Sequence, residues 1–485
     1  MQGEEGWPRV GRMFVTTQRS NQSRGQPLSH RRAEFRSRQH RNCISRALHE
    51  IEAVDFFNVL TGPELLEQTE AHLPEHRERL YPPTVALGMF MKQALSEDGS
   101  CQRAVNGWAA QRVCEGLKPN GVDTGAYCRA RQRLPVEMVK ALTRESGRLL
   151  SAKALPDWRW RGRAVKLVDG STISMPDTPQ NQACYPQPST QALGVGFPIA
   201  RVLAVICLST GAVLEAATCP YEGVGNSELG LLRALGEVFN AGDVMLADTF
   251  YCNYFIIASL QAAGVDAVFE QHSQRIIDFR RGQSLGTRDH CVRWSKPRRP
   301  SWMTREHYAS FPEQLSVREL KANGRILLTT LLDQRVSKQE LADLYCQRWQ
   351  VELDLRNIKV TLGVDVLSCR TPQMVVKELW VHLLAYNLIR LLMAQAAAAN
   401  GVQPRQLSFK HTVQLWTEWT ARKLTHRRTG YNAALWQLLA QVRVADRPGR
   451  AEPRMKKRRP KQYPWMKRSR PLERKQIIVH GRAAA

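Results

Sequence analysis

The sequence predicts a mixed α/β fold, in which a central sheet carries helices on its faces and a helical region precedes it. Residues 201–218, RVLAVICLSTGAVLEAAT, have the composition of two strands joined by a tight turn. Two short apolar runs, 164–170 (AVKLVDG) and 243–248 (DVMLAD), predict buried strands. A helical apolar pattern in residues 226–239 lies between these runs. A hairpin followed by alternating helices and short strands predicts a mixed sheet.

Composition favours a nucleic-acid partner. The chain has 485 residues and contains 70 Lys plus Arg against 44 Asp plus Glu, for a net charge of +26. A surplus of this size attracts phosphate backbones. The most apolar stretch, near Leu383 to Ala399, is interrupted by Asn387 and Arg390, so no membrane span is expected. No secretion leader is recognisable, which predicts a cytoplasmic protein.

Cysteine usage agrees with a reducing compartment. Eleven cysteines are scattered without a CxxC pair or a His/Cys cluster at zinc spacing. Isolated residues such as Cys207, in an apolar run, are typical of small buried hydrophobic side chains. We therefore expect neither a disulfide framework nor a structural zinc ion.

Shifts in composition divide the chain into segments. Arginines at 129, 131 and 133 predict either a solvated cationic face or contact with a DNA backbone. The segments are a flexible basic arm (1–47), a helical region (48–155), an α/β region in two parts (156–265 and 335–400), a β-rich insertion between them (266–334), C-terminal helices (401–445) and a basic tail without a core-forming pattern (446–485).

One stretch carries an unusual set of side chains. In YCQRWQVELDLRNIK, residues Tyr345, Arg348, Glu352 and Lys359 are separated by offsets of three, seven and fourteen from the first. On a continuous α-helix these offsets place all four within an arc of about 60°. A phenol, a guanidinium, a carboxylate and an ammonium on one stripe suit a site that handles metal ions and phosphate. Ser337 is the expected N-cap of this helix.

Two further carboxylates come at the ends of predicted strands. Asp169 and Asp248 each close a short apolar run, and Glu352 lies on the stripe. Convergent carboxylates can hold a pair of Mg²⁺ ions, which prefer oxygen ligands. Each residue also has an ordinary explanation. Asp169-Gly170 can form a turn, Asp248 can cap a helix, and Glu352 can pair with a neighbouring arginine on the surface.

These blocks resemble those of bacterial insertion-sequence transposases of family four. The spacing of Tyr345, Arg348, Glu352 and Lys359 matches that family's Y-x2-R-x3-E-x6-K signature. VDGSTISMPD resembles the first catalytic block, ADTFYCNY the second, and GVDAVFEQ the block after it. AYCRARQRLP is similar to part of the helical N-terminal domain. The resemblance covers residues 48–440.

The resemblance implies a ribonuclease H-like core with a DDE triad. By motif position the triad is Asp169, Asp248 and Glu352, which would be the ligands of two Mg²⁺ ions, for which Mn²⁺ can substitute. Tyr345, Arg348 and Lys359 would contact the terminal DNA strand. Related enzymes carry an all-β insertion, in which a Trp stacks on a base flipped out of the terminus. Here Trp302 or Trp294 would have that role, unless each packs inside the insertion.

The expected function is cut-and-paste transposition. The protein would cleave double-stranded DNA at the inverted repeats of its element and join the freed 3′-hydroxyl to target DNA. A homodimer in a synaptic complex is the natural assembly, in a bacterial cytoplasm at the nucleoid. A nuclease of the same fold without strand transfer, and a non-catalytic DNA-binding relative, are the alternatives. A Tyr345 recombinase nucleophile is a weaker third, because its expected Arg/His surroundings are missing.

Overall fold

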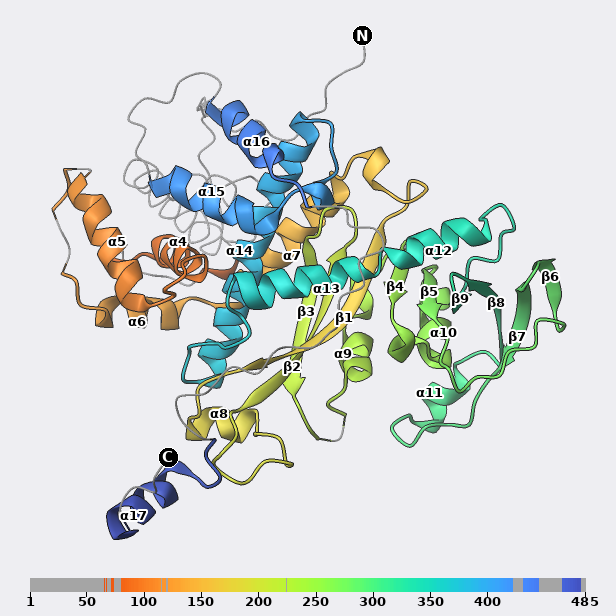
Figure 1. Cartoon of the computed structure of the whole chain (residues 1–485), viewed down its shortest axis with the longest axis horizontal. Coiled ribbons are helices and arrows are strands. Elements are labelled where there is room, and N and C mark those ends of the chain that lie inside the picture. Colours follow the sequence, from red (N-terminus) through yellow and green to blue (C-terminus); the bar gives the residue numbers. More distant parts are fainter. Residues whose placement is uncertain are drawn as a thin grey trace, which may run out of the picture. The chain divides into compact units, whose positions relative to one another are not determined.

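A computed structural model describes residues 80–114, 116–118, 121–223, 225–421, 431–444 and 465–480, together with a few residues between 65 and 73 (Figure 1). The predicted basic arm (1–47) and the first part of the basic tail lie outside the described residues. The chain divides into two compact units. One comprises residues 1–162, 207–215 and 379–442, and the other comprises residues 163–206, 216–378 and 443–485.

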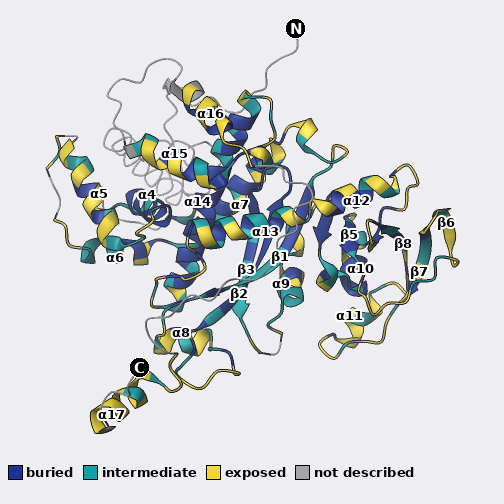
Figure 2. Ribbon diagram, in the orientation of Figure 1, coloured by how far each residue is buried: buried dark blue, intermediate teal, exposed yellow. Residues whose placement is uncertain are grey.

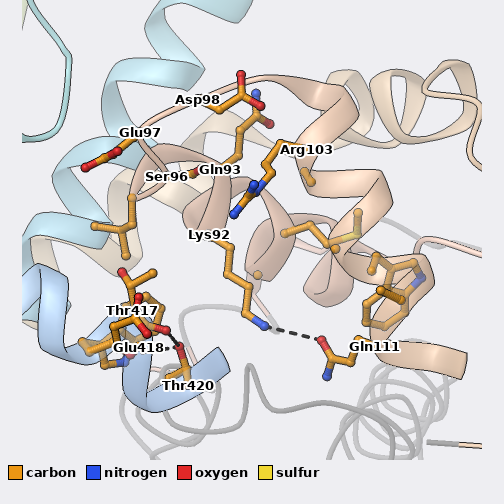
Figure 3. A pocket seen from close by; sticks show the side chains of 18 of the residues that line it. Lys92, Gln93, Ser96, Glu97, Asp98, Arg103, Gln111, Thr417, Glu418 and Thr420 are labelled. Carbon is orange, nitrogen blue, oxygen red and sulfur yellow. Dashed lines mark hydrogen bonds between the residues drawn. The ribbon is translucent and has the colours of Figure 1, made fainter. Parts of the chain in front are cut away.

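The first unit is largely helical. In the part of this unit that the structure describes, the helices are α4 (Pro83–Ala94), α5 (Cys101–Cys114), α6 (Gly125–Arg133), α7 (Val136–Ala152), α14 (Pro372–Ala399, of which residues 379–399 belong here), α15 (Phe409–Ala421) and α16 (Tyr431–Gln441). Among the described residues, α4 and α5 face α15 across a cavity of about 1230 Å³ (Figure 3). Lys92 reaches across part of it to the Gln111 side chain, with 3.5 Å between Nζ and Oε1.

The three arginines of α6 do not share a face. Arg129 and Arg133 are exposed, whereas Arg131 is buried and its guanidinium lies 3.8 Å from the centre of the Phe90 ring. The prediction of a common cationic face at these three positions is therefore wrong. Residues two apart on a helix differ by about 200° in direction, so the middle arginine points into the helical core.

The long apolar helix α14 is a core element. It is long and apolar enough to cross a membrane, but 78% of its most apolar window is buried inside the protein (Figure 2). Its Asn387 side chain is fully buried, accepts a hydrogen bond from Val213 N and donates to Val213 O and Thr143 O at 2.8 to 3.0 Å. These bonds satisfy the N–H and C=O groups of Val213, the first residue of β3, and a C=O group of α7. They explain why a polar side chain is buried in the core.

The sheet has nine strands in the order β3-β2-β1-β4-β5-β9-β8-β7-β6. Strands β1, β4 and β5 are parallel, while β5 and the strands that follow it in this order pair antiparallel. The strands are β1 (Val165–Ser174), β2 (Ile199–Cys207), β3 (Val213–Pro220), β4 (Val244–Ala247), β5 (Asp266–Glu270), β6 (Gln283–Gly286), β7 (Asp289–Ser295), β8 (Gln314–Ala322) and β9 (Arg325–Thr329). The predicted mixed sheet and the predicted hairpin of β2 and β3 are confirmed.

The β-rich segment 266–334 continues this sheet. Its first strand, β5, pairs in parallel with β4, and its last, β9, returns beside β5. We expected the insertion to begin at residue 266, but Asp266–Glu270 belongs to the parallel core. The apolar sequence GVDAVFE predicts a buried strand in either case, and only its pairing partner decides where it belongs.

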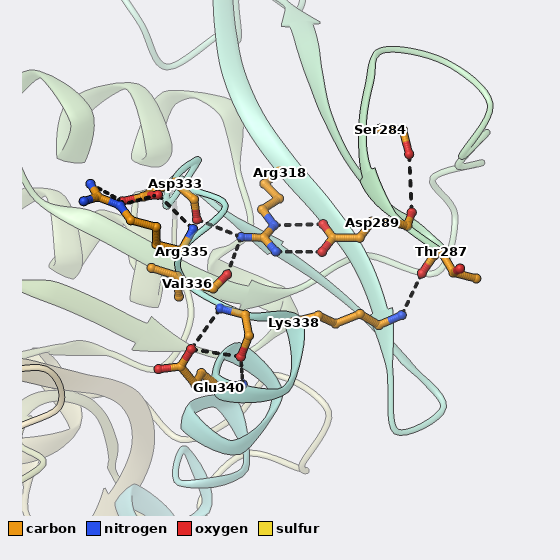
Figure 4. Close-up of polar contacts among 11 residues, drawn as sticks. Ser284, Thr287, Asp289, Arg318, Asp333, Arg335, Val336, Lys338 and Glu340 are labelled. Atoms are coloured by element: carbon orange, nitrogen blue, oxygen red, sulfur yellow. Dashed lines mark hydrogen bonds and ion pairs between the residues drawn. The ribbon is translucent and has the colours of Figure 1, made fainter.

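A buried ion pair joins β7 and β8 to the approach of α12. Arg318 donates two hydrogen bonds to the Asp289 carboxylate, at 2.8 and 2.6 Å, and a third to Val336 O at 2.8 Å (Figure 4). The bidentate geometry compensates for removing both charges from water. Directly after Val336, Ser337 caps α12 in a capping box with Glu340, as expected.

Helices that pack against the sheet include α10, α12 and α13. The predicted helix from Asn253 to Ala263 is confirmed, with Asn253 as N-cap and Gly264 in the left-handed region after it. The remaining helices of this unit are α8 (Pro179–Cys184), α9 (Glu228–Ala234), α10 (Tyr254–Ala262), α11 (Arg305–Ala309), α12 (Lys338–Cys346), α13 (Trp349–Arg356) and, in the tail, the largely exposed α17 (Arg470–His480).

Candidate active site

The two predicted aspartates lie on neighbouring strands of the sheet. Asp248 directly follows β4, as predicted, but Asp169 lies in the middle of β1 (Val165–Ser174), so its predicted place at a strand end is wrong. Strands β1 and β4 are parallel neighbours in which Leu167 pairs with Leu246. Asp169 and Asp248 each come two residues later, so they stand at the same level in adjacent strands. Because side chains two residues apart in a strand point to the same face, the pairing favours two carboxylates side by side.

Burial and charge raise the pKa of both groups. Burial, together with Asp248 and Glu228, raises the pKa of Asp169 to about 7, although the Gly170 backbone N–H donates to its Oδ1 at 2.8 Å. The pKa of Asp248 is also raised by burial, with a further contribution from Glu228. Asp248 accepts a bond from Phe250 N at 2.9 Å and caps a short 3₁₀ turn. Its alternative role, as the cap of the helix from Asn253 to Ala263, is wrong, because Asn253 caps that helix.

Arg348 links Glu352 to these two aspartates. Its Nη2 lies 2.9 Å from Glu352 Oε1, and both side chains are only partly exposed. The positive charge of the same guanidinium partly offsets the rise in the pKa values of Asp169 and Asp248, so it acts on both aspartates. Helix α13 packs against β1, the strand that contains Asp169. The expected pairing of Glu352 with a neighbouring arginine is observed, and it occurs beside the aspartates.

The four-residue stripe does not lie on one continuous α-helix. Helix α12 ends at Cys346, α13 begins at Trp349, and residues 357–361 form a π-helical turn. A constant step of 100° therefore does not hold from Tyr345 to Lys359. Tyr345 instead donates to Glu270 Oε2 at 3.2 Å, and Lys359 pairs with Asp365 at 2.9 Å. Burial raises the pKa of Tyr345, so its phenol stays protonated.

Sequence reasoning missed Glu228. This residue begins α9, and its carboxylate accepts a hydrogen bond from the Tyr251 hydroxyl at 2.8 Å and pairs with Arg201 at 3.0 Å. An acidic residue just after a serine N-cap is common at helix starts, where it faces the positive end of the helix dipole. The local sequence therefore held no signal that set Glu228 apart from an ordinary capping residue.

The two candidate tryptophans have different surroundings. Trp302 is 50% exposed, with the Arg233 guanidinium 4.0 Å from its ring centre and Phe255 against its edge. Trp294 is buried, donates from Nε1 to Glu319 at 2.9 Å and is covered by Arg275. Of the two, Trp302 is the one with ring surface open to a partner, while Trp294 packs in the interior of the β-rich segment.

The donor set suits a hard divalent cation. Within the described residues, no group of three His, Cys, Asp or Glu is arranged as a preformed metal site. However, burial and then the charge of Glu228 raise the pKa values of Asp169 and Asp248, Arg348 lowers them, and Arg201 pairs with Glu228. Oxygen ligands alone fit Mg²⁺ or Mn²⁺ better than zinc.

Comparisons with known proteins agree with this architecture. The family described as "Transposase DDE domain" matches residues 160–388. The chain is 28% identical over 422 residues to the transposase InsG of insertion sequence element IS4 from Escherichia coli, covering 83% of this chain and 91% of that protein. It is also 37% identical over 71 residues to the transposase of element IS421 from Escherichia coli, covering 14% of this chain and 19% of that protein.

A solved structure is also similar over most of its length. It is the cryo-EM structure of a piggyBac transposase synaptic complex with hairpin DNA, with a TM-score of 0.39 and 11% identity, covering 84% of this chain and 88% of that one. The domain match and the similarity to InsG identify the chain as a DNA transposase of the DDE class. It belongs to family four of the bacterial insertion-sequence transposases, the family of element IS4.

Proposed function

We propose that this transposase cleaves the ends of its own element and joins the freed 3′-hydroxyl to target DNA by cut-and-paste transposition. The core that does this would be ribonuclease H-like, with Asp169, Asp248 and Glu352 as its DDE triad. The observation that carries the proposal is the meeting of Asp169 and Asp248 on adjacent parallel strands, with Glu352 tied beside them through Arg348.

The triad carboxylates would hold two Mg²⁺ ions, or Mn²⁺ in their place. When bound, such ions activate the attacking oxygen and stabilise the leaving one in a phosphoryl displacement. The protein's part is to keep three carboxylates deprotonated and fixed in place. Since the pKa of Asp169 is about 7 without a cation, a bound cation would favour its charged form.

Basic and aromatic groups around the triad would position the DNA end. Arg348 presents a planar guanidinium that can serve both Glu352 and a phosphate. Lys359 is partly exposed and can exchange Asp365 for a phosphate oxygen, and the Tyr345 hydroxyl would contact the terminal strand beside them. Trp302 would stack on a base flipped out of the terminus, because half of its surface is open.

The helical region from residue 48 to 155 would bind the inverted repeats as the N-terminal DNA-binding domain. The exposed Arg129 and Arg133 on α6 are its candidate backbone contacts. A homodimer would hold two element ends in a synaptic complex, in the bacterial cytoplasm at the nucleoid. The segments outside the described residues that carry Arg and Lys would add sequence-independent contacts.

The test is a reaction of the protein with double-stranded element ends, target plasmid and Mg²⁺. Cleaved ends together with joined products support transposition, whereas cleaved ends that never join identify a nuclease without strand transfer. Glu352→Gln keeps the shape of the side chain and removes its charge. We expect it to lower cleavage by more than about 100-fold, because even indirect partners of metal ligands contribute 10- to 100-fold.

A control separates chemistry from binding in that experiment. Binding of the element end should persist in Glu352→Gln, measured in Ca²⁺, which supports binding of the DNA without rapid cleavage. Glu237→Gln changes an exposed carboxylate outside the site and should leave cleavage unchanged. Full cleavage by Glu352→Gln would contradict the triad assignment. If the wild-type protein binds element ends but neither cleaves nor joins them, the non-catalytic alternative is correct.

A further inference from the structure

The carboxylate of Glu228 lies against Gly170 on β1, the residue after Asp169. A Cβ atom added at Gly170 would stand 2.1 Å from Glu228 Cδ and 2.5 Å from both of its oxygens. A real Cβ never approaches so closely, so only glycine at position 170 leaves space for this carboxylate. Gly170 directly follows Asp169, which places Glu228 next to the first aspartate of the triad.

A buried tyrosine ties the same carboxylate to the end of β4. Tyr251 is fully buried, lies three residues after Asp248, and donates from its hydroxyl to Glu228 Oε2 at 2.8 Å. Burial, and then the charges of Glu228 and both aspartates, raise the pKa of this phenol, so it remains a donor. Glu228 therefore contacts one residue beside Asp169 and one residue near Asp248.

The other oxygen has a cationic partner that holds it in place. Arg201, on β2, lies 3.0 Å from Glu228 Oε1 and also donates to Tyr221 O at 3.2 Å. An arginine and a phenol fix the direction of the carboxylate, yet each carboxylate oxygen has a second lone pair for another ligand.

We propose that Glu228 is a fourth carboxylate of the metal site, held by Tyr251 and Arg201 in the space left by Gly170. This inference rests on the proposed DDE function and extends it. With Glu352 paired to Arg348, Glu228 is a carboxylate that contacts both Gly170, next to Asp169, and Tyr251, near Asp248. It supplies the negative charge that a second divalent ion requires next to Asp169 and Asp248.

The experiment measures binding of Mn²⁺ alone to the metal-free, full-length protein, from the loss of the free-ion electron paramagnetic resonance signal. Glu228→Gln should weaken Mn²⁺ binding by about 10-fold or more. Gly170→Ala should weaken binding similarly although Glu228 is still present, since the methyl group displaces its carboxylate. Tyr251→Phe keeps the ring and loses one hydrogen bond, so it should give a smaller effect in the same direction.

Two comparisons decide between the possible results. Asp169→Asn should abolish tight binding. Glu237→Gln changes an exposed carboxylate in the segment after α9, and this variant should bind Mn²⁺ as the wild type does. If Asp169→Asn weakens binding but Glu228→Gln and Gly170→Ala do not, Glu228 is not a ligand and the triad stands. If Asp169→Asn also binds normally, the proposed metal site itself is wrong. Thermal unfolding without metal identifies variants whose loss of binding reflects misfolding. Glu228→Asp keeps the charge on a side chain one methylene shorter, so it should bind Mn²⁺ better than Glu228→Gln.

Discussion

Arg348 and Glu352 form an ion pair across one helical turn, with 2.9 Å between Nη2 and Oε1. The pair stands where the charge of Arg348 also acts on Asp169 and Asp248. A single guanidinium therefore holds the third carboxylate of the proposed triad and offsets the charge of the first two. Several consequences of this arrangement can be measured.

Replacing Arg348 by lysine should impair cleavage more than DNA binding. Lysine keeps the positive charge, but it lacks the planar fork that serves Glu352 and neighbouring groups together. We expect the single-turnover cleavage rate to fall at least about tenfold, as for loss of a fixed donor at a reacting phosphate, while affinity for element ends falls less. Arg356→Lys, at an exposed position on the same helix, is the control. Equal losses of binding and cleavage would assign Arg348 to binding alone.

The stability of the metal-free protein should depend on Asp169 and on pH. Because the pKa of Asp169 is about 7 in the folded protein and near 3.8 when unfolded, the folded state holds an extra proton between these values. Stability therefore decreases as pH rises through this window, by up to about 4 kcal/mol. Asp169→Asn should raise the melting temperature at pH 8 and have little effect at pH 4.

Two comparisons test the origin of that effect. Asp177→Asn, at an exposed position, should not show the pH dependence. Saturating Mg²⁺ should stabilise the wild type at pH 8 but not Asp169→Asn, because a bound cation favours the charged carboxylate. A melting-temperature difference that is the same at both pH values would show that Asp169 does not have a raised pKa in the folded protein.

Arg318 should be important for stability without contributing to chemistry. Arg318→Met leaves Asp289 as a buried charge without its bidentate partner, which costs about 3 to 5 kcal/mol. The midpoint of chemical denaturation of the β-rich segment, measured by tryptophan fluorescence, should shift to a lower denaturant concentration. Arg335→Met breaks an exposed pair with Asp333 and should leave the denaturation midpoint almost unchanged. A double change of Arg318 and Asp289 to apolar residues should recover much of the loss.

Trp302 should stack on a base at the DNA terminus. Trp302→Ala removes the exposed ring and should lower the fluorescence change of 2-aminopurine placed at the end of the terminal strand, with a loss of about 1 to 3 kcal/mol of stacking. Trp302→Phe should retain part of the signal. Trp465→Ala removes another exposed tryptophan and serves as the control. An unchanged signal in Trp302→Ala would exclude stacking on this ring.

Removal of residues after 446 should weaken DNA binding in a salt-dependent way. This segment includes the exposed helix α17, which carries Arg470, Arg474 and Lys475. Each lost phosphate contact reduces the slope of log K against log salt by about 0.9. Mg²⁺-dependent cleavage of element ends should remain at low salt. An unchanged slope would show that the tail does not contact DNA.

The sequence by itself determined the features that depend on near neighbours. The β2–β3 hairpin, the helix from Asn253 to Ala263 and the Ser337 cap all follow from local periodicity and from hydrogen bonds over a few residues. The strand end before Asp248 was predicted for the same reason, since an apolar run that ends in an aspartate is visible without knowing its partners. The same pattern placed Asp169 at a strand end, which is wrong, because β1 continues to Ser174.

Only the tertiary structure decided which distant side chains meet. Glu228 looks like an ordinary helix-start residue until Gly170 and Tyr251 are found against it, and Arg131 looks solvated until Phe90 lies under it. The break between α12 and α13 likewise replaced a stripe of four residues by the Arg348–Glu352 pair. Burial and pairing of this kind depend on segments far apart in the chain, and local periodicity carries no information about them.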